Sequence, residues 1–161
     1  TGAFKRAWGA FGKPPGGEDS CAIVGPKSFP DAEGPAHFNV AHAIRVANDG
    51  MVYLADRENR RVQMFTSDGK FVKQLIRTAA PFARDLALSP DSEQQFLYIG
   101  GGKSIVVADR KTLDIVAAID VPAQIGPGHH IATDSKGNIY IAQTSAGLQK
   151  LVFKGMSSPA K

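Results

Sequence analysis

The stretch VYLADRENRRVQMF, residues 52–65, contains two strand-like runs that are separated by a cluster of charge. VYLA is a nearly continuous apolar run, which is typical of a strand buried on both faces. RVQMF alternates apolar and polar side chains, as a strand with one buried face does. The segment DRENR between them predicts a turn at the edge of a sheet, where Asp56 and Asn59 would hydrogen-bond backbone groups.

The same pattern recurs twice further along the chain. HAIRVANDGMVYLAD starts at His42, and HHIATDSKGNIYIAQ starts at His129. The positions at which these two segments coincide are His42/His129, Ile44/Ile131, Gly50/Gly137, Tyr53/Tyr140 and Ala55/Ala142. RDLALSPDSEQQFLYIGG, starting at Arg84, is a third copy that carries Tyr98 at the shared tyrosine position after a short insertion. The copies begin about 42 to 45 residues apart, which is the length of a four-stranded propeller blade.

We therefore predict an all-β fold, a partial β-propeller of about three four-stranded blades, over residues 1–161. The turn signals NDG and SDG between apolar runs favour antiparallel hairpins. The last copy has only three strand-like runs, whereas GAFKRAWGAFG near the N-terminus reads as an outer strand with no blade in front of it. The predicted segments are an outer strand of a preceding or partner blade at 1–12, a Gly/Pro-rich loop at 13–37, and blades at 38–77, 83–121 and 128–155, the last without its outer strand.

Composition excludes several classes of protein. The length of 161 residues suits one domain, and 43% apolar and 21% charged residues are ordinary for a globular protein. The net charge of +4 is mild and the Lys and Arg residues are scattered, so no nucleic-acid partner is expected. No apolar run approaches the ~20 residues that span a bilayer, so no membrane partner is expected. Because the chain begins at Thr1 and not at Met, we expect a processed product or a fragment. The single cysteine, Cys21, is interpreted as a bystander thiol.

The unit H-x-I-x-V…DG-x-V-Y-x-A-D-R-x-N-x-R-V-Q-x-F, residues 42–65, resembles a blade of the NHL-repeat propellers. Within that group, AHAIRV and YLADRENRRVQMF most resemble the lyase that cleaves peptidyl-α-hydroxyglycine in peptide amidation, and its bacterial relatives. The resemblance covers most of residues 38–155 and is most specific over ADRENRRVQMF. It implies a six-bladed propeller, of which this chain would be the C-terminal half, and an extracellular or periplasmic location.

The resemblance also implies a site on the propeller axis. The family holds a zinc ion there with three histidines that start the inner strands of alternate blades, and His42 and His129 match two of these positions. The catalytic arginine of the family follows the AD of the second strand, which makes it Arg57 here. The third zinc histidine and the catalytic tyrosine would lie outside this chain, and His130 stands where the family has an acidic residue. Calcium is a second ion that the resemblance implies.

Each of these residues also has a structural interpretation. Two imidazoles are fewer than the three or four protein ligands usual for zinc, and a histidine that begins a strand is usually a hydrogen-bonded structural residue. Arg57 would either brace its turn or contact an anion or substrate, and both interpretations stay open. We interpret His130 as a polar rim residue in preference to a ligand. Because Tyr53, Tyr98 and Tyr140 recur at one repeat position, we expect them to pack in the core or between blades.

Three functions follow from these patterns. The chain would be half of a zinc-dependent peptidylamidoglycolate lyase-like enzyme, a non-catalytic scaffold that binds a protein, a peptide or a small molecule, or a structural subunit of a larger assembly. We favour the scaffold for the chain itself, because one zinc ligand and the catalytic tyrosine are missing. Three blades leave two sheet edges exposed, so a partner is expected. It would be a second copy, in a head-to-tail homodimer in which residues 2–12 complete the last blade of the other chain, or else a missing N-terminal half.

Overall fold

The computed structural model describes residues 2–15, 34–77, 83–101, 104–121, 128–144 and 147–155. Within these ranges the chain forms three antiparallel sheets, which confirms the predicted all-β fold and partial β-propeller. Blade 1 consists of β1 (Ala41–Val46), β2 (Val52–Asp56), β3 (Arg61–Phe65) and β4 (Phe71–Ile76). Blade 2 consists of β5 (Asp85–Leu88), β6 (Phe96–Gly100), β7 (Ser104–Asp109) and β8 (Ile115–Asp120). Blade 3 consists of β9 (His130–Thr133), β10 (Ile139–Ala142) and β11 (Leu148–Leu151).

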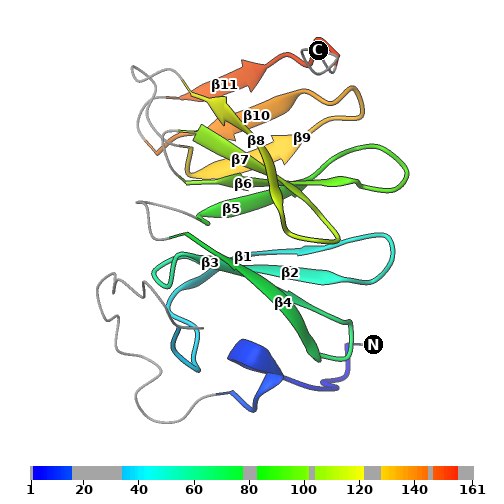
Figure 1. Cartoon of the computed structure of the whole chain (residues 1–161), viewed down its shortest axis with the longest axis vertical. Coiled ribbons are helices and arrows are strands. Elements are labelled where there is room, and N and C mark those ends of the chain that lie inside the picture. The colour runs from blue at the N-terminus through cyan, green and yellow to red at the C-terminus, as the bar shows by residue number, and fades with distance from the viewer. Residues whose placement is uncertain are drawn as a thin grey trace.

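The three blades follow one another along the long axis of the molecule, from the N-terminal end to the C-terminal end (Figure 1). Each blade is a meander in which every strand pairs with the next one along the chain. The first strands of the blades are neighbours, because β1 packs beside β5 and β5 packs beside β9. These three strands form the inner side of the array, and the ends at which they begin make up what we term the axial mouth.

Short polar turns close the hairpins at the rim opposite the axial mouth. In the β1–β2 turn, Asp49 Oδ1 accepts the backbone N–H two residues further on at 3.1 Å, and Gly50 has a φ of 82°. Such a positive φ favours glycine, which has no Cβ to clash with the backbone. In the β9–β10 turn, Asp134 Oδ1 accepts the N–H groups two and four residues further on, both at 3.0 Å. The turn residues seen in the sequence thus act through specific backbone hydrogen bonds.

Two buried apolar clusters hold the blades together, one between each pair of neighbours. The cluster between blades 1 and 2 contains Tyr53 of β2 and Leu86 of β5, both fully buried. The cluster between blades 2 and 3 contains Ile131 of β9, and Tyr98 of β6 packs against it. Each interface therefore joins the repeated tyrosine of one blade to the Leu or Ile near the start of the next, which confirms the inter-blade packing predicted for these two tyrosines.

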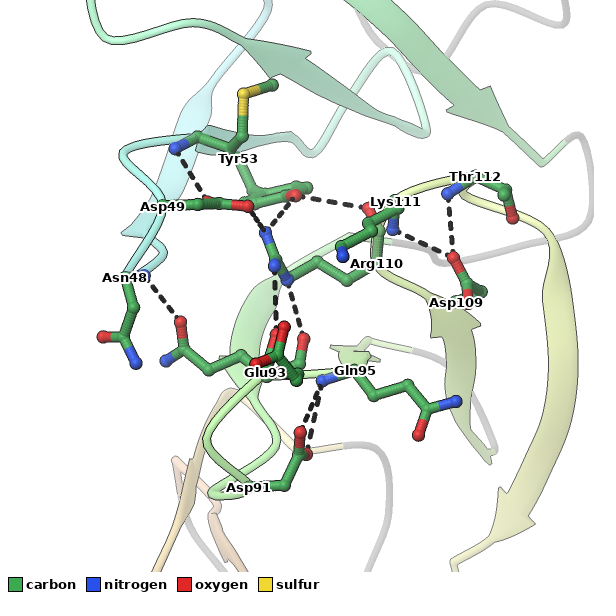
Figure 2. A network of polar contacts seen from close by, with 12 residues as sticks. Asn48, Asp49, Tyr53, Asp91, Glu93, Gln95, Asp109, Arg110, Lys111 and Thr112 are labelled. Carbon is green, nitrogen blue, oxygen red and sulfur yellow. Dashed lines mark hydrogen bonds and ion pairs between the residues drawn. The ribbon is translucent and has the colours of Figure 1, made fainter.

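A buried arginine adds a polar clamp between blades 1 and 2 (Figure 2). The Arg110 guanidinium, which is 3% exposed as a residue, donates to Asp49 Oδ2 at 2.8 Å and to the Tyr53 hydroxyl at 3.1 Å. It also donates to the carbonyl oxygens of Glu93 at 3.0 Å and Gln94 at 2.7 Å. Desolvation acts to raise the pKa of the Asp49 carboxyl, but the hydrogen bond and charge of Arg110 hold it below its ordinary value. The clamp fixes turns of both blades at the rim opposite the axial mouth.

The N-terminal segment, residues 2–15, is not a strand within the single chain. It contains a single 3-10 turn, η1, at Ala10–Gly12, and no strand. Trp8 packs against Phe65 with ring centroids 6.3 Å apart, and Phe11 packs against an aromatic ring of β4 at 5.1 Å. The predicted outer strand belongs to a preceding or partner blade, and such a blade lies outside this chain, so that pairing stays a prediction. The segment instead packs Trp8 and Phe11 on the face of blade 1 that points away from blade 2.

Arg61, the first residue of β3, is fully buried although it is charged. Its Nε donates to Asp56 Oδ2 at 2.7 Å, and its NH2 group donates to the carbonyl oxygens of Pro35 at 2.9 Å and His37 at 3.0 Å. The Asn59 amide donates to the same carboxylate at 2.8 Å and to the same His37 carbonyl at 3.0 Å. The arginine is buried because the segment that precedes β1 crosses this face of blade 1 and offers it carbonyl acceptors.

The predicted connection at 13–37 is described only at its ends, because residues 16–33, including Cys21, lie outside the described residues. Its C-terminal end continues over the outward face of blade 1, where the ring of Phe38 meets Phe65 edge-on at 6.3 Å. In the part of the chain that the structure describes, no helix is long and apolar enough to cross a membrane.

Candidate functional site at the axial mouth

Three repeat-equivalent side chains meet where the inner strands begin. His42 lies near the start of β1, Arg84 directly precedes β5, and His129 directly precedes β9. The register of β1 against β2 shifts between Ala41 and Ala43, so His42 lies in a β-bulge. A bulge changes the direction of a side chain relative to a regular strand and is common beside functional sites.

The imidazole rings of His42, His129 and His130 form a cluster. The centroid distances are 5.1 Å between His42 and His129 and 4.5 Å between His129 and His130. The rings of His42 and His130 are stacked at 6.0 Å. The structure thus brings together the two histidines singled out as metal ligands. It adds His130, whose side chain is 61% exposed, to their immediate surroundings.

Hydrogen bonding determines which ring nitrogen of His42 is free. Nδ1 lies 2.5 Å from the carbonyl oxygen of Arg84, and because a carbonyl can only accept, Nδ1 carries the proton and donates. Nε2 of the neutral ring then offers a lone pair. The same hydrogen bond ties the bulge of β1 to the residue that precedes β5, so blades 1 and 2 share this part of the axial mouth.

A buried carboxylate, Asp85, connects the three inner strands beside the histidine cluster. Its Oδ1 accepts from the Arg45 guanidinium at 2.9 Å and from the N–H of Leu86 at 2.8 Å. Its Oδ2 accepts from the N–H of Ile131 at 2.9 Å and lies 3.4 Å from Nδ1 of His130. The sequence analysis missed Asp85. The available signal was a charge inside an inner strand, at a position where the other copies carry alanine and histidine.

Arg57, the residue that the resemblance makes catalytic, directly follows β2, and its side chain is 30% exposed. Its backbone N–H donates to the carbonyl oxygen of Val40 at 3.1 Å, and its Nε donates to Glu58 Oε1 at 2.7 Å. These contacts brace the turn. The positive charge of Arg57 also contributes, as the smallest of the named causes, to the lowered pKa of His129.

The surroundings of His129 favour its neutral form. Partial desolvation lowers the pKa of its imidazole, and nearby positive charges lower it further. Those charges belong to His130, His42, Arg84 and Arg57. A neutral imidazole is able to coordinate a metal or to accept a hydrogen bond, but an anion would relieve the repulsion among these groups.

The histidine cluster fits zinc in its donor chemistry but not in its arrangement. A protein zinc site usually combines three or four protein ligands in a tetrahedron. Across the described ranges, no group of three or more His, Cys, Asp or Glu side chains is placed so as to hold a metal ion. The positive charges of Arg57 and Arg84, which act on His129, also oppose a cation.

Comparison with known proteins gives partial matches. No family model matches the chain. The chain is 28% identical over 131 residues to NHL repeat-containing protein 3 of Homo sapiens, and 26% identical over 146 residues to the protein of the same name from Mus musculus. These matches cover 70% and 79% of the chain but only 35% and 39% of the two relatives. The chain therefore spans little more than a third of the length of these relatives.

Two solved structures share the fold. Hydrazine synthase of Kuenenia stuttgartiensis matches with a TM-score of 0.57 at 16% identity, over 80% of this chain and 33% of that one. A protein of unknown function from Bacteroides caccae matches with a TM-score of 0.56 at 13% identity, over 71% of this chain and 47% of that one. At such identities the likeness concerns the fold alone. The chain is similar in sequence to NHL repeat-containing proteins, and its three repeats and three-bladed fold agree with that similarity.

Proposed function

We propose that this chain is a β-propeller binding scaffold whose axial mouth binds an anionic group, such as the C-terminal carboxylate of a peptide. One observation carries the proposal, namely the cluster of three imidazole rings where the inner strands begin, on which the positive charges of two arginines also act. These groups belong to His42, His129, His130, Arg57 and Arg84. Carboxylate oxygens would accept charge-assisted hydrogen bonds from such donors, and these are stronger than neutral ones.

Among the described residues, the carboxylates near the axial mouth leave this charge unbalanced. Asp85 is buried, and both of its oxygens already accept hydrogen bonds from the inner strands. Glu58 is held by Nε of Arg57. Arg84 forms no ion pair with another described residue. An incoming carboxylate would therefore meet a net positive surface and would relieve the repulsion that lowers the pKa of His129.

A second candidate is the zinc-dependent lyase-like enzyme that the resemblance implies. The tautomer of His42 favours it, because Nε2 is left free to coordinate. The neutral state of His129 favours it as well. We rank this candidate second because the histidine cluster, as placed, does not form a zinc coordination shell. The relatives, moreover, carry the name of their repeat and not of an activity.

Isothermal titration calorimetry with acetyl-Ala-Ala-Gly and with its C-terminal amide tests the anion proposal. The free acid should bind, and the amide should bind at least about tenfold more weakly, because it lacks the charge. Arg57→Gln should weaken binding of the acid at least about tenfold, since it removes a charged donor. Lys136→Gln, at the rim opposite the axial mouth, is the control and should leave binding unchanged. Equal binding of acid and amide, or binding of neither, would contradict the proposal.

A zinc titration separates the second candidate from the first. Zinc needs neutral imidazoles, so its affinity falls as the pH is lowered through the histidine range, whereas the affinity for an anion rises. His129→Asn should abolish zinc binding if the histidine cluster is the site. His37→Asn, outside the cluster, is the control. Zinc binding that follows this pattern, together with acid and amide peptides that bind equally, would put the second candidate first.

A further inference from the structure

The interface between blades 1 and 2 resembles the interface between blades 2 and 3. Blade 1 and blade 3 each carry one of the two faces of such an interface on the side that points away from blade 2. In both internal interfaces a tyrosine of the second strand shares a buried cluster with a Leu or Ile of the first strand in the next blade. The pairs are Tyr53 with Leu86 and Tyr98 with Ile131. Ile44 and Tyr140 occupy the same repeat positions in the first and last blades. Neither has a blade opposite it among the described residues.

The outward face of blade 1 is apolar and open near the axis. Ile44 is 53% exposed, whereas its repeat counterparts Leu86 and Ile131 are 0% and 3% exposed. Val46, on the same face of β1, is 61% exposed. The Ile44 side chain, whose counterparts are core residues in the other two copies of the repeat, is thus left in solvent.

The outward face of blade 3 shows the complementary pattern at the other end of the array. Tyr140 points away from blade 2, because its neighbours on either side in β10 belong to the cluster between blades 2 and 3. Leu148 pairs with Ala142 in the way that Val62 pairs with Ala55 in blade 1. Val62 is fully buried against blade 2, but Leu148 is 72% exposed.

We infer that the outward face of blade 3 packs on the outward face of blade 1 of a second copy of this chain, head to tail and in both directions. The internal interfaces show that a face of the Tyr140 type fits a face of the Ile44 type. One chain carries one of each at opposite ends, so two chains satisfy both. Two chains close a ring of six blades, which lies within the roughly four to eight blades usual for propellers. A twofold axis then runs along the channel.

The N-terminal segment fits this arrangement. Trp8 and Phe11 lie over β3 and β4, the outer half of the outward face of blade 1, and leave the inner half around Ile44 open. In the ring, residues 2–12 lie beside β11 of the partner, whose outer edge has no strand partner among the described residues. Pairing there gives the segment the backbone partner that it lacks within its own chain, and covers an exposed sheet edge.

Ring closure also completes the axial mouth. The inner strands of both chains line one channel, so the histidine clusters of both chains face it. A ligand on the axis would then be held by two chains. The dimer does not depend on the anion proposal. A chain that fails to dimerise would be recognised by its molecular mass, whereas a failure of the anion proposal would be recognised by peptide binding.

Sedimentation velocity of the full chain at micromolar concentration tests the ring, and we expect a dimer. Ile44→Arg and Leu148→Arg each place an unpaired charge in the interface, and each should raise the dimer dissociation constant at least about tenfold. Val116→Arg is the control, because Val116 is similarly exposed at 54% but lies on the outer strand of blade 2. It should leave the dissociation constant unchanged.

Mixing the two variants tests the head-to-tail geometry. The Leu148→Arg chain keeps a native Ile44 face, and the Ile44→Arg chain keeps a native Leu148 face. One interface of the mixed pair is therefore intact, so a heterodimer should appear on mixing although neither variant forms an intact interface alone. Circular dichroism of each variant establishes that it is folded.

Three outcomes would overturn the inference. A folded wild-type monomer at micromolar concentration would leave both faces to further blades of a longer polypeptide. A dimer that resists both arginine substitutions would place the contact elsewhere. A mixture of folded variants that stays monomeric would exclude the head-to-tail arrangement.

Discussion

The imidazole rings of His42 and His129 lie 5.1 Å apart at an interplanar angle of 67°, although the two residues begin the first and the third repeat. A complete four-stranded blade lies between them along the chain. The rings meet because the inner strands of successive blades are neighbours, so residues at the same repeat position converge at one end of the array. The axial mouth is therefore a joint product of all three blades.

Arg57→Gln should raise the pKa of His129 toward its ordinary value of 6.5, because desolvation and several positive charges, that of Arg57 among them, now lower it. Titration of the histidine ring protons by NMR measures this pKa. The pKa of His129 is lower in the folded chain than in the unfolded one. The neutral ring therefore stabilises the fold fully at a pH above its ordinary pKa. This contribution is lost as the pH falls through the folded pKa. Lys136→Gln, far from the cluster, should leave the pKa unchanged, and an equal rise in both variants would contradict this account.

Arg61→Met should lower the free energy of unfolding by about 3 to 5 kcal/mol, because it leaves the buried carboxylate of Asp56 without its ion-pair partner. Burial already raises the pKa of Asp56, and removal of Arg61 should raise it further, so the loss should shrink in acid. Urea unfolding at neutral and acidic pH measures both effects. The double variant with Asp56→Asn should be more stable than Arg61→Met alone. Lys70→Met, at an exposed lysine, is the control.

Gly69→Ala should detach Trp8 from blade 1. A Cβ at Gly69 would lie 2.7 Å from Cδ2 of Trp8, and the φ of 88° adds backbone strain of about 1 kcal/mol. Gly50→Ala is a matched control, because φ there is 82° but the nearest atom, in Ser67, is 4.0 Å away. Trp8 is the single tryptophan, so a red shift of the fluorescence emission in Gly69→Ala alone reports the detachment. An equal shift in both variants would assign the effect to backbone strain.

Asp134→Asn should reduce the acid sensitivity of the fold. The hydrogen bond from the Asn138 side chain, with further backbone and hydroxyl donors, lowers the pKa of the Asp134 carboxyl from 3.8 to about 2. A lowered carboxyl pKa contributes stability that is complete above the ordinary value and is lost as the pH falls from about 4 to 2. Thermal unfolding between these pH values should show a shallower decline for Asp134→Asn than for the wild type. Lys136→Gln, in the same turn, should decline like the wild type.

The sequence by itself determined the fold class, the repeats and the turns of this protein. These features are read from alternating side chains, hairpin residues and a blade-length period. Such patterns lie in the sequence itself and do not depend on which distant segments pack against them. The resemblance, with the repeat alignment, also singled out His42 and His129, because equivalent positions of stacked blades must face the same axis. For Arg57, sequence left two roles open, and both stay open, because Arg57 contacts Val40 and Glu58 while its charge acts on His129.

Only the tertiary structure determined the features that depend on contacts between segments distant in the sequence. Arg61 is buried because residues that precede β1 cross its face and present carbonyl oxygens, and no pattern around Arg61 encodes that crossing. Asp85 became the link among inner strands because Arg45 and the N–H of Ile131 reach it from two other blades. Residues 2–12 read as a strand, but in the single chain the segment packs on β3 and β4 through Trp8 and Phe11, and it pairs with no strand among the described residues. The sequence indicates that a segment is able to form a strand, whereas the fold determines whether another strand lies beside it to accept its backbone hydrogen bonds.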